Sequence, residues 1–498
     1  MEYNIPLKKT LKENLDELKK ILNECDDIIF RELKVGSNKP VSMELIFVDG
    51  MIDRDDLSSF VLRPLLRISD DILSNGNKSI DSLIDMLSKE NIQISDMKVI
   101  QNMEEVIKAV LSGETVLLID GSEKAIDLST RGWPSRSIGE PVSEETVRGP
   151  RDGMTETLKT NIALIRRRIR DTNLKVKMMQ LGKRSKTDVA VMYMEDIVEP
   201  RLLNETYKRL NNLKVDEIID SSMLESLIED HCYSPFPQIE NTERPDAVAA
   251  SLYEGRVAII VDNSPFALLV PATVGTLMQS TEDYYTRWSV ASIVRIIRYF
   301  AAFLAVLAPS LYIAVTSYHP GLLPTRLAYY VAASRVNVPF PSVIEAFLME
   351  ITLELLREAG TRISGPIGTT IGIVGGLIIG QAAVDAGIVS PLMIIIVSVT
   401  TISSFAIPSY ELATALRFFR FLFMIYAAVL GLYGVMLGII VMITHMAKLD
   451  SFGIPFTSPY SGLGREKGDL RDTIIRVPFQ NMKKRPRFTF PKNRTRLK

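Results

Sequence analysis

Lysine is missing from a long central part of this chain of 498 residues. No lysine occurs from Val215 to Ala447, and from Tyr299 onward that stretch holds only a few arginines and carboxylates. Charged side chains crowd the first ~290 positions and the last ~50 instead, so the average hydrophobic content of 47% hides a sharp shift. A segment so poor in charge cannot all face water. The sequence therefore predicts a soluble portion, then a membrane portion, then a polar tail.

Cysteine is also scarce, and what there is excludes several protein classes. Cys25 and Cys232 lie far apart in the sequence, which offers neither a disulfide framework nor the ligand spacing of a zinc site. The first residues are polar and charged and lack the apolar core of a signal peptide. We expect the soluble portion to stay on the cytoplasmic side, with no metal and no cofactor.

The sequence also lacks the common catalytic motifs. It contains no GxxxxGK[ST], HExxH or GxSxG pattern and no nucleotide fingerprint between a strand and a helix. The basic, glycine-flanked run Gly464–Gly468 does not have the spacing of a phosphate loop. The chain is therefore predicted not to be an enzyme.

The soluble portion alternates helical and strand-like patterns, typical of an α/β fold. Residues 7–33 and 102–111 have helical spacing, and residues 43–48 form a strand-like run. A hairpin over Thr115–Leu128, with an aspartate-containing turn, resembles a second one over Glu254–Val270. We expect two related α/β subdomains.

These patterns set the expected domain boundaries. They are a first cytoplasmic α/β subdomain at 1–130, a linker arm at 131–153, a second α/β subdomain at 154–285, a transmembrane domain at 286–448 and a basic cytoplasmic tail at 449–498.

Four segments are long and apolar enough to cross a bilayer, which takes about 20 residues. They are residues 299–317, 367–384, 388–407 and 421–444. Residues 320–360 are ambiguous, because a helix from Pro341 to Gly360 mixes apolar side chains with glutamates and could be re-entrant, interfacial or water-lining. Buried carboxylates need partners, so either they pair with nearby arginines or the loops lie elsewhere. The candidate polar membrane residues are Glu345, Glu350, Glu354, Arg417 and Arg420.

Glycine recurs at every fourth position in the second predicted span. Such spacing makes a flat helix face that another backbone can approach closely. Two interpretations stay open: packing within one subunit, or packing between identical subunits around a pore with a hydrophobic constriction. The candidate residues are Gly368, Ile371, Gly372, Val374, Gly376, Ile378 and Gly380. Gly434 and Gly438 form a shorter version in the last span.

The last sixteen residues, Lys483 to Lys498, hold eight Lys or Arg and no acid. This run either contacts anionic lipid headgroups or nucleic acid, or is a solvated tail that fixes topology by the positive-inside rule. The second interpretation is favoured, so no nucleic-acid partner is expected. A cytoplasmic N-terminus and a cytoplasmic tail require an even number of crossings.

Two long blocks, Glu114–Gly153 and Pro339–Pro391, together with the arginine-bearing helix near Asn161–Ile169, resemble the GerA family of spore germination proteins. The resemblance spans roughly residues 40–480. It implies an A subunit in the inner membrane of the endospore, partnered by a transporter-like B subunit and a lipoprotein C subunit. It further implies a homo-oligomeric, nutrient-gated channel for monovalent cations, with the glycine-rich span as a pore element.

Two other functions compete with a channel subunit. A secondary transporter subunit predicts inverted repeats and helices broken at mid-membrane, and no convincing repeat is found among the four spans. A non-conducting scaffold for germination signalling predicts soluble lobes that recruit partners.

Overall fold

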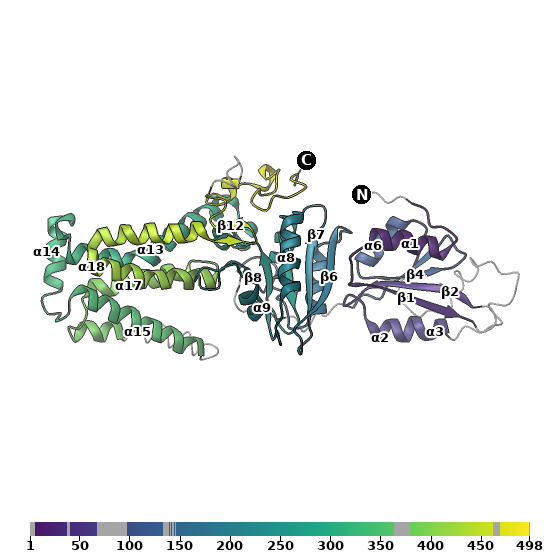
Figure 1. Cartoon of the computed structure of the whole chain (residues 1–498), viewed down its shortest axis with the longest axis horizontal. Helices are drawn as coiled ribbons and strands as arrows, with labels where there is room; N and C mark the ends of the chain where they lie inside the picture. Colours follow the sequence, from purple (N-terminus) through teal and green to yellow (C-terminus); the bar gives the residue numbers. More distant parts are fainter. Residues whose placement is uncertain are drawn as a thin grey trace. The chain divides into compact units, whose positions relative to one another are not determined.

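The computed structural model describes residues 5–36, 40–66, 97–132, 139, 141, 144, 146–362, 379–461 and 469–497. The chain divides into two compact units, coloured by sequence in Figure 1. The α/β unit comprises Met1–Glu229, Ile239–Pro271 and Lys483–Lys498. The helical unit comprises Asp230–Gln238 and Ala272–Met482.

The first lobe of the α/β unit is a five-stranded antiparallel sheet between two layers of helices. Strand order is β1-β2-β4-β5-β3. The strands are β1 (Ile28–Val35), β2 (Val41–Val48), β3 (Met97–Ile100), β4 (Thr115–Ile119) and β5 (Ala125–Leu128), and the helices are α1 (Leu11–Ile21), α2 (Arg54–Asp56), η1 (Leu57–Leu62), α3 (Arg63–Leu66) and α6 (Met103–Leu111).

Alternation along the strands explains the two layers. In β2, Ile46 and Val48 pack with α1 and α6, whereas Leu45 and Phe47 pack on the opposite face with η1 and α3. Successive side chains of a strand point to opposite faces, and both faces of this sheet are covered (Figure 1). The strand therefore reads as a continuous apolar run.

The second lobe repeats this plan. Its sheet order is β6-β7-β9-β10-β8, which is the order of the first sheet with each strand number raised by five. The strands are β6 (Leu174–Leu181), β7 (Thr187–Met194), β8 (Glu240–Thr242), β9 (Val257–Val261) and β10 (Ala267–Val270), and the helices are α7 (Leu158–Arg168), α8 (Pro200–Asn212), α9 (Ser221–Ile228) and α10 (Pro245–Tyr253). The expectation of two related α/β subdomains is confirmed.

The hairpin turns that suggested the repeat also cap helices. Asp120, in the β4–β5 turn, accepts a hydrogen bond of 2.9 Å from the backbone N–H of Leu11 at the start of α1. Asp262, in the β9–β10 turn, accepts one of 3.0 Å from Leu158 at the start of α7. The first N–H groups of a helix have no partner within it, so a carboxylate there stabilises the helix by hydrogen bonding and by charge.

A buried asparagine is the second shared device. In α1 the side chain of Asn14 accepts from the N–H of Lys8 and donates to its carbonyl, at 2.9 and 2.6 Å. In α7 the side chain of Asn161 makes the same pair of bonds to Thr155, at 2.8 and 2.5 Å. Both asparagines stand three residues after the helix start, so the segment before each helix is fixed in the same way.

The first lobe departs from the expected elements at its N-terminal end. The helix expected over 7–33 ends at Ile21, and Ile28 already begins β1. Segment 23–27 between them does not continue either element. It runs beside the edge of the second sheet instead, where Cys25 forms a parallel bridge with Val176.

A buried ion pair fastens this junction between the lobes. The Arg166 guanidinium, at the end of α7, donates to both carboxylate oxygens of Asp27 at 2.7 and 2.9 Å. Neither side chain is more than 3% exposed. Burial raises the pKa of the adjacent Cys25 thiol, which favours the unreactive protonated form.

Part of the expected linker arm is ordered against the second lobe. The buried Arg244 side chain donates to the carbonyl oxygens of Glu144 and Pro150, at 3.2 and 2.9 Å, and to the Thr146 hydroxyl at 3.1 Å. Burial raises the pKa of the Glu144 carboxyl to about 7, although that carboxyl accepts a hydrogen bond from Thr242.

The basic tail also docks on the second lobe. The Arg485 guanidinium donates to the carbonyl of Tyr253 at 2.7 Å, the Thr489 hydroxyl donates to that of Glu254 at 2.7 Å, and the Lys492 N–H donates to that of Ile197 at 2.8 Å. These bonds hold the tail through backbone carbonyls, and Arg496 adds an ion pair of 3.8 Å to the carboxylate of Glu254. Neither of the two expected roles, a headgroup-binding run or a solvated tail, anticipated this docking.

The helical unit contains two helices that are long and apolar enough to cross a membrane, α13 (Trp288–Ser317) and α18 (Tyr410–Lys448). A third apolar helix, α17 (Pro391–Phe405), is shorter. The remaining elements are α11 (Val274–Leu277), α12 (Glu282–Tyr285), η3 (Pro320–Leu322), α14 (Thr325–Ser334), α15 (Ser342–Arg362), a helix at 379–385, β11 (Asp450–Ser451), β12 (Ile454–Pro455), η4 (Asp469–Asp472) and η5 (Phe479–Asn481).

We predict that the two buried asparagines contribute alike to the stability of their lobes. Asn14→Ala and Asn161→Ala each leave a backbone N–H and a carbonyl without their partner, which should lower the free energy of unfolding by about 2 kcal/mol. Urea unfolding of the purified chain measures the loss. Asn204→Ala, at an exposed position of α8, is the matched control, with an expected change within about 0.5 kcal/mol. Equal stability of all three variants would contradict the assignment.

Candidate functional site

Four of the five predicted polar membrane residues, all except Glu345, meet between α15 and the first half of α18. Arg420 lies 3.0 Å from a carboxylate oxygen of Glu350 and 3.3 Å from one of Glu354. Arg417 lies 3.2 Å from the other oxygen of Glu354. The side chains of Glu350 and Arg420 are each 1% exposed. Of the two alternatives left by the sequence, pairing of glutamates with arginines is the one that forms.

A third guanidinium joins the same network, which the sequence did not suggest. Arg357 lies 3.4 Å from a carboxylate oxygen of Glu354 and stacks over the ring of Phe405 at 5.5 Å. It stands one helical turn after Glu354 on α15, a spacing at which side chains meet. The three-residue spacing could have suggested the contact with Glu354, but it gave no indication of the contact with Phe405 on α17.

Parts of the network carry polar atoms without a hydrogen bond. Two nitrogens of Arg420 and one oxygen of Glu350 are buried and lack a partner among the described residues. Burying an ionised group without full hydrogen bonding costs several kcal/mol by order of magnitude. These atoms can form hydrogen bonds with water or a small polar ligand between α15 and α18.

Glu345 occupies a separate site at the start of α15. Its fully buried carboxylate accepts hydrogen bonds from the N–H and the hydroxyl of Ser390, at the start of α17. The hydroxyl of Tyr312, on α13, lies 3.2 Å from that of Ser390, and Arg335 lies 3.6 Å from the carboxylate. Three helices therefore meet on one carboxylate.

The last predicted span, residues 421–444, is not a single straight helix. At Gly431 the backbone is non-helical, with φ 59° and ψ −139°, and α18 turns back on itself. The rings of Phe419 and His445 are 6.1 Å apart, whereas a straight helix would separate those residues by about 39 Å. The expectation of one crossing failed because a lone glycine in an apolar run is indistinguishable in sequence from ordinary membrane-helix glycine.

The two arms of this hairpin touch at Gly434 and Gly438. A side-chain carbon at Gly434 would stand 2.0 Å from the carbonyl oxygen of Tyr426, and one at Gly438 would stand 2.8 Å from the ring of Phe423. The close packing expected of small residues at this spacing is therefore between two arms of one hairpin.

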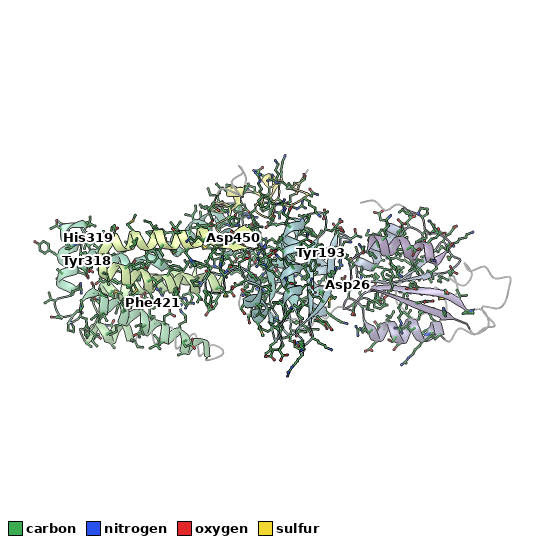
Figure 2. The ribbon with its side chains drawn as sticks, viewed as in Figure 1. Asp26, Tyr193, Tyr318, His319, Phe421 and Asp450 are labelled. Atoms are coloured by element: carbon green, nitrogen blue, oxygen red, sulfur yellow. The ribbon has the colours of Figure 1, made fainter. Side chains whose placement is uncertain are left out.

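Tyr318 closes the turn from outside α18. Its hydroxyl donates to the carbonyls of Ala428 and Val429, which lose their helical partners at the reversal. Figure 2 labels Tyr318 and His319 together at the end of the helical unit. Since Tyr318 follows directly after α13, the α18 turn and the end of α13 lie at the same end of the bundle.

A second charged cluster stands at the other end of α13. The carboxylate of Asp283 binds both Arg295, at 2.8 Å, and Arg298, at 3.0 Å. Asp472, from η4, lies 3.1 Å from Arg295 and accepts from the hydroxyl of Tyr284 at 2.6 Å. Burial opposes ionisation of Asp283, but the two guanidinium groups outweigh it and lower its pKa. Both arginines directly precede the first predicted span, residues 299–317.

Most of the glycine-ladder candidates lie outside the described residues. These are Gly368, Ile371, Gly372, Val374, Gly376 and Ile378. Gly380 is described, and the position of a side-chain carbon there would contact Ile394 of α17 at 3.6 Å. Among the described residues, no three His, Cys, Asp or Glu side chains gather as metal ligands.

Comparisons with known proteins follow the whole chain. Residues 16–488 match the family model of the Bacillus/Clostridium GerA spore germination protein. The chain is 43% identical to spore germination protein B1 of Bacillus subtilis, over 98% of each protein. It is 40% identical to spore germination protein KA of the same organism, over 97% of this chain and 88% of that one.

Two further matches concern the membrane and soluble portions. The chain is 40% identical, over 97% of its length and 91% of the relative's, to the B. subtilis membrane protein YfkQ. A crystal structure of the N-terminal domain of the A subunit of the Bacillus megaterium spore germinant receptor GerK3 is 31% identical. It covers 54% of this chain and 98% of its own, with a TM-score of 0.42.

The Glu350–Arg420 pair should behave as a unit. Arg420→Met leaves Glu350 buried without its partner and should destabilise the purified protein by about 3–5 kcal/mol, whereas adding Glu350→Leu should recover most of that loss. Thermal unfolding in detergent measures both. Lys448→Met, at an exposed position near the end of α18, is the control. A double variant less stable than Arg420→Met would refute the pairing.

The hairpin in α18 predicts which residues react from which side of a bilayer. In a chain that carries Cys232→Ser, which removes the exposed native thiol, Val429→Cys, beside the turn, should react with an impermeant maleimide from one face of a reconstituted vesicle, and Tyr410→Cys from the opposite face. Both residues are largely exposed, at 66% and 68%. Ile440→Cys, within the second arm, is the unreactive control. If a cysteine at position 429 reacted as little as one at position 440, the result would support one membrane crossing by α18 instead of a hairpin.

Proposed function

The chain belongs to the GerA family of Bacillus/Clostridium spore germination proteins, and we propose that it forms a nutrient-gated channel for monovalent cations as the A subunit of a germinant receptor. Membership rests on the match over residues 16–488 and on identities of about 40% across nearly the whole chain. The family is non-enzymatic. A relative that matches 97% of this chain is described as a membrane protein, in keeping with the apolar helices α13 and α18.

The buried ion network between α15 and α18 is the observation that supports conduction. Ionisable residues within membrane helices are costly and face the bundle interior or a water-filled cavity, where they mark ion pathways. Glu350, Glu354, Arg417 and Arg420 meet this description, since the side chains pair with one another instead of facing outward. Two nitrogens of Arg420 and one oxygen of Glu350 have no hydrogen-bond partner among the described residues, and such groups could bind the water or ions of a polar path.

The channel would be built from several copies of this chain. In this proposal Gly368, Gly372 and Gly376 pack identical subunits around an axis, while Gly380 faces Ile394 of α17 in its own chain. Ile371, Val374 and Ile378 form a hydrophobic constriction that gates by dewetting. The complex would sit in the inner membrane of the endospore, with both termini in the spore core. Its partners would be a transporter-like B subunit, which binds the nutrient, and a lipoprotein C subunit.

The form of α18 argues against a secondary transporter. Transporters break their helices near mid-membrane, where the exposed backbone groups bind substrate. The break at Gly431 lies beside Tyr318, at the end of α13, and its free carbonyls are already bonded to that tyrosine. The reversal is therefore a hairpin turn at the end of the bundle.

Potassium release from spores tests the channel. Gly372→Leu or Gly376→Leu should prevent assembly and abolish nutrient-triggered release, and Val374→Ala should change the gating threshold. Gly321→Leu is the matched control, because a side-chain carbon there has nothing within 4 Å. Normal release in every variant would reject the pore assignment.

Reconstitution separates the remaining alternatives. Purified oligomers should carry a monovalent cation current across a planar bilayer. A nutrient-dependent flux without conductance would favour a transporter subunit, and the absence of both would favour a scaffold.

A further inference from the structure

The connection between α13 and α15, residues 318–341, lies across one end of the helical unit. The hydroxyls of Ser317 and Ser342, on its two sides, are 2.6 Å apart. Tyr318 binds the α18 turn, and Figure 1 shows α14 at this end, beside the ends of α13 and α18. The connection therefore begins where the long apolar helices stop.

Helix α14 is too short to enter the bilayer as a span. Its 10 residues extend about 15 Å, half of the hydrocarbon thickness. Val331 is its only buried residue. Tyr329 and Arg326 stand on the face opposite Val331, and Tyr329 and Tyr330 are 75% and 61% exposed. The helix thus presents an aromatic and cationic face outward.

Charge on this connection has one sign. No Asp or Glu occurs between Ser317 and Glu345, whereas His319, Arg326 and Arg335 do. Arg335 faces the buried Glu345 carboxylate, and Arg326 is exposed. Tyrosine with exposed arginine is the composition of protein surfaces at the headgroup level of a membrane.

We propose that α14 lies in the headgroup layer of the membrane and binds anionic lipid through Arg326, with Tyr329 and Tyr330 inserted beside it. Anionic headgroups complement the one-signed charge of the connection. The inference does not depend on channel activity.

Apolar exposure at this end favours lipid over water. Single exposed apolar residues are ordinary on a soluble protein, but a group of them on one short segment marks an interaction surface. The exposed large residues of the connection are Tyr318, Leu322, Leu327, Tyr329, Tyr330, Val336 and Phe340. Val429 and Tyr433, beside the α18 turn that Tyr318 binds, are exposed as well, so exposed apolar side chains gather at the level where α18 reverses.

Spin labels measure the depth of α14 directly. The full chain carries Cys232→Ser, since Cys25 is buried and Cys232 is the exposed thiol. A nitroxide is attached at Tyr329→Cys or, separately, at Tyr330→Cys. Labels at Tyr233→Cys, 99% exposed, and at Ile440→Cys, 58% exposed on α18, serve as the water and hydrocarbon references. The protein is reconstituted in phosphatidylcholine vesicles with and without phosphatidylglycerol, and collisions with oxygen and a nickel chelate are compared.

The α14 labels should give oxygen-to-nickel ratios between the two references, several-fold above that of position 233. The ratio should rise with phosphatidylglycerol, and Arg326→Gln should remove that rise. A ratio equal to that of position 233 would place α14 in water and overturn the proposal. Low collision rates with both reagents would assign the surface to a protein partner or a second copy. An intermediate ratio that ignores lipid charge would overturn the assignment to anionic headgroups.

Discussion

The pairing of Glu350 with Arg420 is the constraint on which the helical unit depends. Both side chains lie among apolar helices, where an unpaired charge costs several kcal/mol. Their pairing fixes the rotation of α15 about its axis and its height beside the first arm of α18. Arg417 and Arg357 then meet Glu354 from two helices, so a charged layer crosses the bundle where the sequence alone shows scattered charges.

The reversal of α18 gives this layer its place in the bundle. Because the chain turns at Gly431, His445 returns to Phe419 and both contact Phe236. Phe236 also packs on Phe456, just after α18. Helix α18 therefore begins and ends at the same end of the helical unit.

Sequence patterns predicted the elements of the α/β unit better than they predicted which side chains pair within the helical unit. The hairpin expected over Glu254–Val270 forms as β9 and β10, because alternation, glycine and aspartate turns are local signals. Burial of charge left pairing of glutamates with arginines as one of two alternatives and did not indicate which residues would pair, since Glu354 and Arg417 are 63 positions apart. Gly434 and Gly438 were recognised as packing residues, yet no local signal says that the facing surface is the same helix folded back.

The ion pair that joins the two lobes of the α/β unit lies at a position where the two similar lobes differ. Leu11 and Asn14 of α1 correspond to Leu158 and Asn161 of α7, so Lys19 corresponds to Arg166. Lys19 is exposed and stands over the ring of Phe30, whereas Arg166 is fully buried against Asp27 of the other lobe. The equivalent position is thus an exposed lysine in the first lobe and a buried arginine in the second lobe. The planar guanidinium of Arg166 can bind both carboxylate oxygens of Asp27, which an ammonium group could not do in the same geometry. The two lobes share one strand order, and Arg166, which replaces the lysine of the first lobe, joins them.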